Sequence, residues 1–177
     1  MRNLRILSFF VFLAIFSLTF ALASEVQLSE DETMIIMEEF DTMTKGIDAV
    51  GIFVHNVSIA LPMFIPGFGI FWGLFAAFST GIAFSAMKST IPLLNQVPSL
   101  SILFMSPFGL MELAAYSIAM SRSYILIHQI IKKMPIRPDI RVICLEVAIL
   151  VALLLAGGFL EYFLIESMSG FDSGMID

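Results

Sequence analysis

The sequence predicts an all-α fold, a polytopic transmembrane helical bundle of four or five spans with an acidic amphipathic helix outside the membrane. Hydrophobic residues make up 59% of the 177-residue chain and charged residues only 14%, whereas globular domains average roughly 25% charged residues. One small domain cannot hide so large an apolar set in its interior, so lipid is the expected solvent. The charges are also segregated, with acids concentrated in residues 25–48 and the C-terminal tail, and bases at the N-terminus and in residues 122–141.

Residues 1–24 are predicted to form either a signal peptide or a first transmembrane helix. Arg2 and Arg5 supply a positive start, and Ala21-Leu22-Ala23 has the small-x-small pattern of a signal-peptidase site. The uncharged run 6–24 contains nineteen residues, which is also enough to span a bilayer. Both alternatives stay open, and both place residue 24 outside the cytoplasm.

Residues 25–48 are predicted to form an acidic amphipathic helix. Ser29 and Glu32 have the spacing of a capping box, in which each side chain accepts a hydrogen bond from the other residue's backbone N–H. Gly46 is suited to end the helix. Apolar residues recur between them at helical spacing, at Met34, Met37, Phe40, Met43 and Ile47. The helix is expected either to lie against the outer ends of the bundle or to bind the basic surface of a partner.

Residues 49–166 are predicted to form the membrane domain. A single helix over the 39 residues of 49–87 would be about 58 Å long, nearly twice the ~30 Å hydrocarbon thickness, so this stretch must contain two spans. The turn between them is expected at Pro62–Gly69, where prolines and glycines cluster. The spans are assigned to residues 49–65, 68–87, 100–121 and 141–165, with a polar tail at 167–177. Residues 123–133 are expected to continue the third of these as a helix at the surface.

The basic residues predict the orientation. Residues 122–141 carry five of them, and this segment falls on the same side of the bundle as Arg2 and Arg5. By the positive-inside rule that side is cytoplasmic. The protein is therefore expected to be a multi-pass protein of the cell membrane, with residues 122–141 cytoplasmic and with residues 25–48 and the C-terminus extracytoplasmic. The five bases are Arg122, Lys132, Lys133, Arg137 and Arg141.

Glu112 is the most informative residue because it lies deep within an apolar run. A carboxyl group at the centre of a membrane helix costs about 2.5–3.5 kcal/mol on insertion scales, so Glu112 is expected to face other helices. His55 and Asn56 lie at a similar depth in another predicted span and are its expected partners. The three residues form a candidate intramembrane polar site. The site is either a structural clamp between helices or part of a transport or proton-relay path.

Small and helix-breaking residues are expected to shape the bundle. Small residues let two helix backbones approach closely, and irregular backbone at membrane depth is tolerated where protein buries it. Pro107 and Gly109 suggest a broken or kinked helix next to Glu112. The residues assigned to turns or to helix packing are Gly67, Gly69, Gly73, Gly81, Pro107 and Gly109.

The sequence carries none of the motifs of common soluble enzymes. It has no G-x-S-x-G, H-E-x-x-H, P-loop or Rossmann glycine pattern. The single cysteine, Cys144, allows neither an internal disulfide nor a thiolate metal site. We therefore expect no catalytic residues, no cofactor, no metal and no nucleic-acid partner. The expected partners are the lipid bilayer and other membrane or extracytoplasmic proteins, and the oligomeric state is left open.

Several short motifs follow one another between residues 45 and 166, and in this order they resemble the stage II sporulation protein M family of integral membrane proteins. The resemblance implies that Glu161 is a family position. Phe108 departs from it, because the family has a histidine there, and the N-terminal segment looks more cleavable than a family first helix. The motifs are Phe53-Val54-His55-Asn56, Pro66-Gly67-Phe68-Gly69, Thr80-Gly81, Pro107-Phe108-Gly109-Leu110-Met111-Glu112 with Ala114 and Ala115, and Leu160-Glu161-Tyr162.

The resemblance implies a non-enzymatic membrane scaffold or a subunit of a membrane complex. The sporulation member of the family acts in a membrane complex that recruits cell-wall-degrading partners, although sporulation itself is not implied for this chain. The alternative is a transporter or permease subunit that uses the intramembrane Glu112. The two hypotheses differ in whether Glu112 titrates together with a transported substrate.

Overall fold

The computed structural model describes residues 2–136 and 139–173, and these residues form helices, turns and short connections without any strand. The predicted all-α class is therefore confirmed. The elements are α1 (Arg2–Ala23), α2 (Glu30–Thr44), α3 (Ala49–Ala60), the 3-10 turn η1 (Leu61–Phe64), α4 (Phe68–Thr90), the 3-10 turn η2 (Leu94–Gln96), α5 (Ser99–Met105), α6 (Pro107–Ile131) and α7 (Ile140–Ser173).

Three of the described helical segments are long and apolar enough to cross a membrane, namely Asn3–Ala23, Phe68–Thr90 and Ile140–Ser167. Two further pairs meet the same criterion only when their members are joined. The α2 helix meets the α3–η1 segment at a bend of 120°, and α5 meets α6 at a bend of 89°. The described chain thus offers three to five candidate spans.

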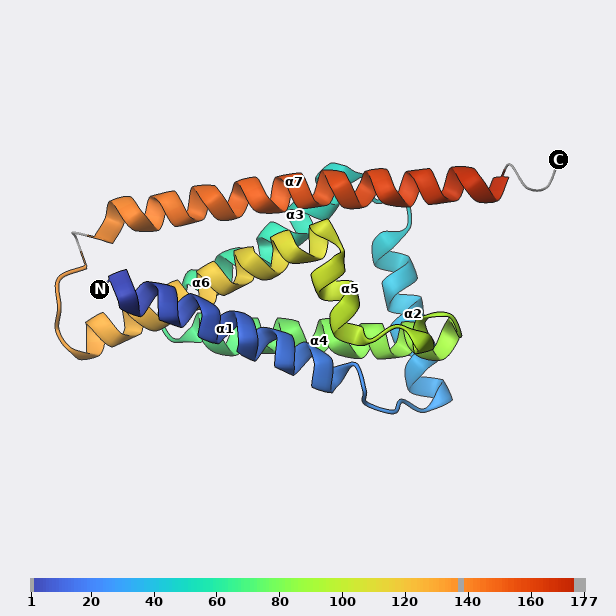
Figure 1. Ribbon diagram of the computed structural model, residues 1–177, viewed down its shortest axis with the longest axis horizontal. Coiled ribbons are helices and arrows are strands. Elements are labelled where there is room, and N and C mark those ends of the chain that lie inside the picture. The colour runs from blue at the N-terminus through green and yellow to red at the C-terminus, as the bar shows by residue number, and fades with distance from the viewer. Residues whose placement is uncertain (1, 137–138, 174–177) are drawn as a thin grey trace.

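The long helices share one direction. Figure 1 shows α1, α4, α6 and α7 running roughly along the long axis of the molecule, with α2 and α5 lying across it. The N-terminus, the end of α6 and the start of α7 lie at one end, and we call this the N-terminal end of the bundle. The α2 helix, the turn that follows α4 and the end of α7 lie toward the other end (Figure 1).

Close helix packing in the core depends on glycines that face other helices. A Cβ atom added at Gly81 of α4 would lie 2.6 Å from the Ala23 Cβ and 2.6 Å from the Phe20 carbonyl oxygen of α1. At Gly73 it would lie 2.5 Å from the sulfur of Met120 in α6. A larger side chain at Gly81 would therefore push α4 away from α1, whereas one at Gly73 would displace the flexible Met120 side chain.

The turn between α3 and α4 falls in the predicted segment 62–69. Gly67 has φ +76°, a conformation that glycine adopts without the steric cost other residues meet. A Cβ atom at Gly69 would overlap the backbone carbonyl of Met63. The Trp72 Nε1 donates to the Ile59 carbonyl oxygen at 2.9 Å, and the Ser123 hydroxyl donates to that of Ile65 at 2.6 Å. The first bond ties α4 to α3, and the second holds the turn against α6.

The segment predicted as a span over residues 100–121 is not one continuous helix. It breaks at Ser106, whose Oγ accepts from the Gly109 backbone N–H at 3.2 Å, and Pro107 occupies the first position of α6. A proline cannot donate the backbone hydrogen bond that would continue α5, and it suits the start of a new helix.

The α6 helix then runs on to Ile131 within the bundle, whereas the sequence pattern predicts residues 123–133 at the surface. Arg122, Ser123 and Gln129 are all buried. The physical reason is that neighbouring segments cover this part of α6. The Ser123 hydroxyl donates to the Ile65 carbonyl oxygen in the α3–α4 turn, Phe12 of α1 packs against Tyr124, and the Gln129 Nε2 donates to Asp139.

Candidate functional site

A first polar layer lies between α3, α6 and α7, and we call it the Glu112 layer. The Asn56 Nδ2 donates a hydrogen bond to the Glu112 Oε1 at 2.6 Å. The Tyr116 hydroxyl lies 3.5 Å from the Asn56 Oδ1, to which it donates a long hydrogen bond. Glu161 of α7 is near enough for its carboxyl group to interact electrostatically with Glu112. Asn56 and Glu112, far apart in the sequence, are therefore in direct contact, and Glu161 lies in the same region of the bundle.

His55 does not belong to this layer. Its side chain is exposed, and its backbone carbonyl accepts a hydrogen bond from the Ser58 hydroxyl at 2.6 Å. Successive residues of an α-helix point about 100° apart. The rotation of α3 that buries Asn56 therefore turns His55 outward, and of the two expected partners the structure brings only Asn56 to Glu112.

Two adjacent glycines allow α7 to approach α3 and α6. A Cβ atom at Gly158 would lie 3.2 Å from both the Ala49 carbonyl oxygen and the Phe53 nitrogen of α3, which is tighter than ordinary contact. At Gly157 it would lie 3.6 Å from the Met111 Cβ of α6. One helical turn further along α7, this approach places Glu161 near Glu112. Gly157 and Gly158 are not among the glycines predicted to pack helices, although they are adjacent in the sequence.

A second polar layer, which we call the Arg122 layer, lies between α1, α6 and α7. Arg122 is only 1% exposed, and its Nε and Nη2 donate to the two carboxylate oxygens of Glu146 at 2.5 and 2.8 Å. Arg5 donates to the same carboxylate through Nη2. Two guanidinium groups therefore share one carboxylate, which leaves the layer with a net charge of +1. Beside it the hydroxyls of Ser8 and Ser121 lie 3.1 Å apart.

Sequence reasoning also missed the Arg122 layer, because Arg122 is the first base of the segment read as a cytoplasmic loop. The two layers lie at different depths. Ten residues of α6 separate Glu112 from Arg122, or about 15 Å at 1.5 Å per residue, and fifteen residues of α7 separate Glu146 from Glu161, or about 22 Å. The same two helices thus meet at two polar contacts, with apolar packing between them.

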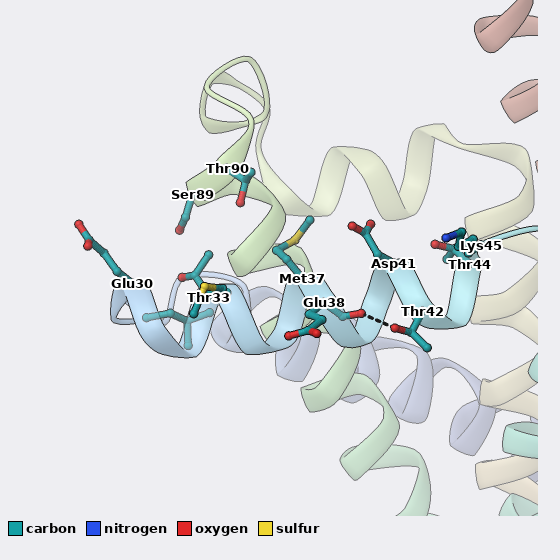
Figure 2. Close-up of a pocket in the computed structure, with 12 residues that line it drawn as sticks. Glu30, Thr33, Met37, Glu38, Asp41, Thr42, Thr44, Lys45, Ser89 and Thr90 are labelled. Carbon is teal, nitrogen blue, oxygen red and sulfur yellow. Dashed lines mark hydrogen bonds between the residues drawn. The ribbon is translucent and has the colours of Figure 1, made fainter.

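A groove of about 1040 Å³ lies between α2 and the end of α4, and we call it the α2 groove. Figure 2 shows Met37 and Asp41 of α2 pointing to the side on which Ser89 and Thr90 of α4 lie. None of the residues of α2 is buried, and Met34 is 65% exposed. The helix carries six acidic side chains and no basic one. The groove is lined by Leu28, Glu30, Thr33, Met34, Met37, Glu38, Asp41, Thr42, Thr44, Lys45, Ser89 and Thr90.

The start of α2 is fixed by the predicted capping box, which is confirmed. The Ser29 backbone N–H donates to the Glu32 Oε2 at 2.9 Å, and the Glu32 N–H donates to the Ser29 Oγ at 3.3 Å. The hydrogen bonds that the Ser29 backbone N–H and the Ser29 hydroxyl donate to the Glu32 carboxylate lower the pKa of Glu32 below its ordinary value. The helix ends at Thr44, and Gly46 follows with φ +73°.

The segment before α2 is tied to the ends of α4 and α5. The Lys88 Nζ donates to the Glu25 Oε1 at 2.7 Å, and the Ser99 hydroxyl donates to the same oxygen at 2.9 Å. Hydrogen bonds from Lys88 and Ser99 lower the pKa of Glu25. The Ser85 hydroxyl donates to the Val26 carbonyl oxygen at 2.6 Å. These contacts with α4 and α5 fix the segment that leads into α2, and they thereby set the position of α2 against the bundle.

The described residues contain no group of three or more His, Cys, Asp or Glu placed to hold a metal ion. Comparison of the chain with protein-family models, curated proteins and solved structures finds no match. The resemblance to the stage II sporulation protein M family therefore stays a prediction from the motifs. Function has to be argued from the two polar layers and the α2 groove.

Proposed function

We propose that this protein is a non-enzymatic integral membrane protein that acts as a scaffold or subunit of a membrane complex, with the α2 groove as its docking surface. The observation that carries the proposal is the exposure and the charge of α2. It lies across the end of the bundle with exposed methionines, unbalanced acidic charge and no buried residue. Exposed apolar surface rimmed by charge is typical of protein interaction sites.

The partner that fits this surface is a basic amphipathic segment of a membrane or extracytoplasmic protein. Methionine side chains adapt to different apolar surfaces because they are unbranched and flexible. Glu30, Glu38 and Asp41 outnumber Lys45 along the groove, so a basic partner is favoured electrostatically and an acidic one is repelled.

The proposed orientation places the N-terminal end of the bundle in the cytoplasm and α2 outside it. Arg5, Lys132 and Arg141 belong to elements that share that end (Figure 1), and basic residues near the ends of spans favour the cytoplasmic side. We also propose that α1 is a retained first span. Its residues Phe12 and Phe16 belong to the core of the bundle, and Ala23 is buried.

The alternative function is a transporter or permease subunit that uses Glu112. The observation that favours it is that two carboxyl groups, those of Glu112 and Glu161, lie in one region within the bundle, where the Asn56 amide donates a hydrogen bond to Glu112. Ionisable groups inside a membrane protein often mark ion or proton paths. On the scaffold hypothesis the same contact is a clamp between α3, α6 and α7.

Site-directed crosslinking in native membranes tests the docking surface. A photo-crosslinking residue at Met37, inside the α2 groove, should yield a discrete product with a second protein. The same residue at Phe71, which is 74% exposed on α4, should not yield that product. Substituting Glu38→Lys together with Asp41→Lys should abolish the product, because both side chains line the groove.

The matched control is Glu39→Lys, a substitution of the same type on the same helix at an exposed residue that does not line the groove. It should leave the product intact. The docking proposal fails if Met37 gives no discrete product, if Phe71 gives the same one, or if Glu39→Lys removes it as completely as the groove substitutions do.

A further inference from the structure

A second groove, of about 380 Å³, opens at the Arg122 layer on the side of the bundle. The α1 helix forms one wall and the α7 helix the other, and both of these helices pack on α6. Its lining includes Arg5, Phe9 and Phe10 of α1, Ile118 and Ser121 of α6, and Glu146 of α7.

The charge at this groove is positive despite the presence of Glu146. That carboxylate accepts hydrogen bonds from Arg122 Nε, Arg122 Nη2 and Arg5 Nη2, so two cations outweigh it. The Nη1 of Arg122 is buried and has no hydrogen-bond partner among the described residues. The buried Arg122 therefore adds positive charge to the cluster without lining the groove. Arg5 is the accessible member, with 35% of its side chain exposed.

The wall beside this positive spot is apolar and open. Phe10 is 59% exposed, and Phe9 and Phe10 lie about one helical turn beyond Arg5 along α1. A positive group at one end and an apolar wall running from it toward the middle of the bundle match an amphiphile with an anionic head and a hydrocarbon tail. The groove also lies at the N-terminal end, where other basic residues gather.

We propose that this groove binds an anionic phospholipid, with its phosphate at Arg5 and an acyl chain along Phe9 and Phe10. Basic side chains near the end of a membrane helix attract anionic headgroups. The two guanidinium groups supply the charge, and the arginine fork is suited to hydrogen bonds with phosphate oxygens. The proposal does not depend on the α2 groove or on a protein partner.

The test uses the full-length protein in nanodiscs that contain phosphatidylglycerol and phosphatidylcholine with identical acyl chains. Lipids that stay bound after gentle extraction are identified by native mass spectrometry. We expect selective retention of phosphatidylglycerol. Arg5→Gln should weaken it about fivefold, because one basic side chain near a charged lipid surface contributes about 1 kcal/mol. Lys132→Gln, an exposed base following α6, should have no such effect.

Further variants separate the lipid from other sources of the same chemistry. Phe10→Ala keeps the charge but removes part of the apolar wall, and it should also weaken retention. Arg5→Lys should retain much of the selectivity, and it serves as the test if Arg5→Gln disturbs folding. Excess inorganic phosphate should displace little lipid, because phosphate lacks the tail.

Four results would overturn the proposal. The first is equal retention of the two lipids, and the second is an equal loss with Arg5→Gln and Lys132→Gln, which indicates a diffuse basic surface. The third is full displacement by inorganic phosphate with no effect of Phe10→Ala, which indicates a simple anion site. The fourth is a measured protein mass that begins at Ser24, because a chain without α1 has no such groove.

Discussion

Removing the Glu146 side chain should strongly destabilise the bundle. The carboxylate accepts hydrogen bonds from Arg122 and Arg5, and Arg122 is 1% exposed. Glu146→Leu would leave a buried guanidinium without its counter-charge, and breaking a buried pair in this way costs about 3–5 kcal/mol. Arg5 is partly exposed, so losing its contact adds no more than about 1 kcal/mol.

The free energy of unfolding can be measured by titrating SDS into detergent micelles. The fluorescence of Trp72, the only tryptophan, reports on the packing of α4, and helix content is followed in parallel.

The double substitution Arg122→Leu with Glu146→Leu removes both charges, and it should recover most of the stability lost by Glu146→Leu, because an apolar pair can replace a buried ion pair. Glu39→Leu, at an exposed residue of α2, is the control and should leave the unfolding free energy unchanged. The reasoning is refuted if Glu146→Leu costs no more than this control, or if the double variant is less stable than Glu146→Leu alone.

Three further outcomes are expected. Glu112→Gln should fold normally because the amide keeps a hydrogen-bond acceptor, whereas Glu112→Leu should lower the unfolding free energy by roughly 1–3 kcal/mol, the cost of stranding its amide partner. Equal stability of the two variants in the SDS titration would rule out the clamp. Gly81→Ala should cost about 1–3 kcal/mol by forcing α4 from α1, whereas Gly157→Ala, with its nearest neighbour at 3.6 Å, should unfold like the wild type. The lowered pKa of Glu25 means that its ion pair with Lys88 stabilises the fold fully above the ordinary glutamate pKa and is lost as the pH falls through the lower, folded-state pKa. Lys88→Met should therefore raise the pKa of Glu25 in an NMR titration, and an unchanged value would contradict the assigned cause.

The features that follow from local rules were predictable from the sequence. The capping box of α2 depends on residues three positions apart, and the turn at Gly67 depends on prolines and glycines beside it. The contact of Glu112 with another helix followed from the cost of an isolated carboxyl group in an apolar run. Each of these features depends on residues close together in the sequence and on the apolar character of their surroundings.

The rotation of α3 was beyond the sequence because its surface is apolar on nearly every side. His55 and Asn56 are adjacent, and no periodic pattern indicated which of them faces α6. The contact with α7 decides this, since Gly158 brings that helix against the backbone of Ala49 and Phe53. Helix phase in a membrane bundle is therefore a tertiary property when the helix lacks a distinct polar face.

The Arg122 layer shows the same limit for charges. Basic residues near the end of a span follow the positive-inside rule whether they face water or protein, so Arg122 could not be told apart from the loop bases Lys132 and Lys133. Its partner Glu146 is 24 residues away in the sequence. The same carboxylate also accepts a hydrogen bond from Arg5, at the other end of the chain. The sequence contains both signs of charge but not their pairing.

The mass of the complex in native membranes tests the scaffold proposal most directly. After mild detergent extraction, wild-type protein and Glu112→Gln should both migrate in one assembly much larger than the 19.6 kDa chain. The groove variant with Glu38→Lys and Asp41→Lys should lose that assembly while its helix content stays unchanged. The account would be contradicted if the wild type migrates without a partner protein, or if the groove variant keeps the assembly and Glu112→Gln alone disrupts it.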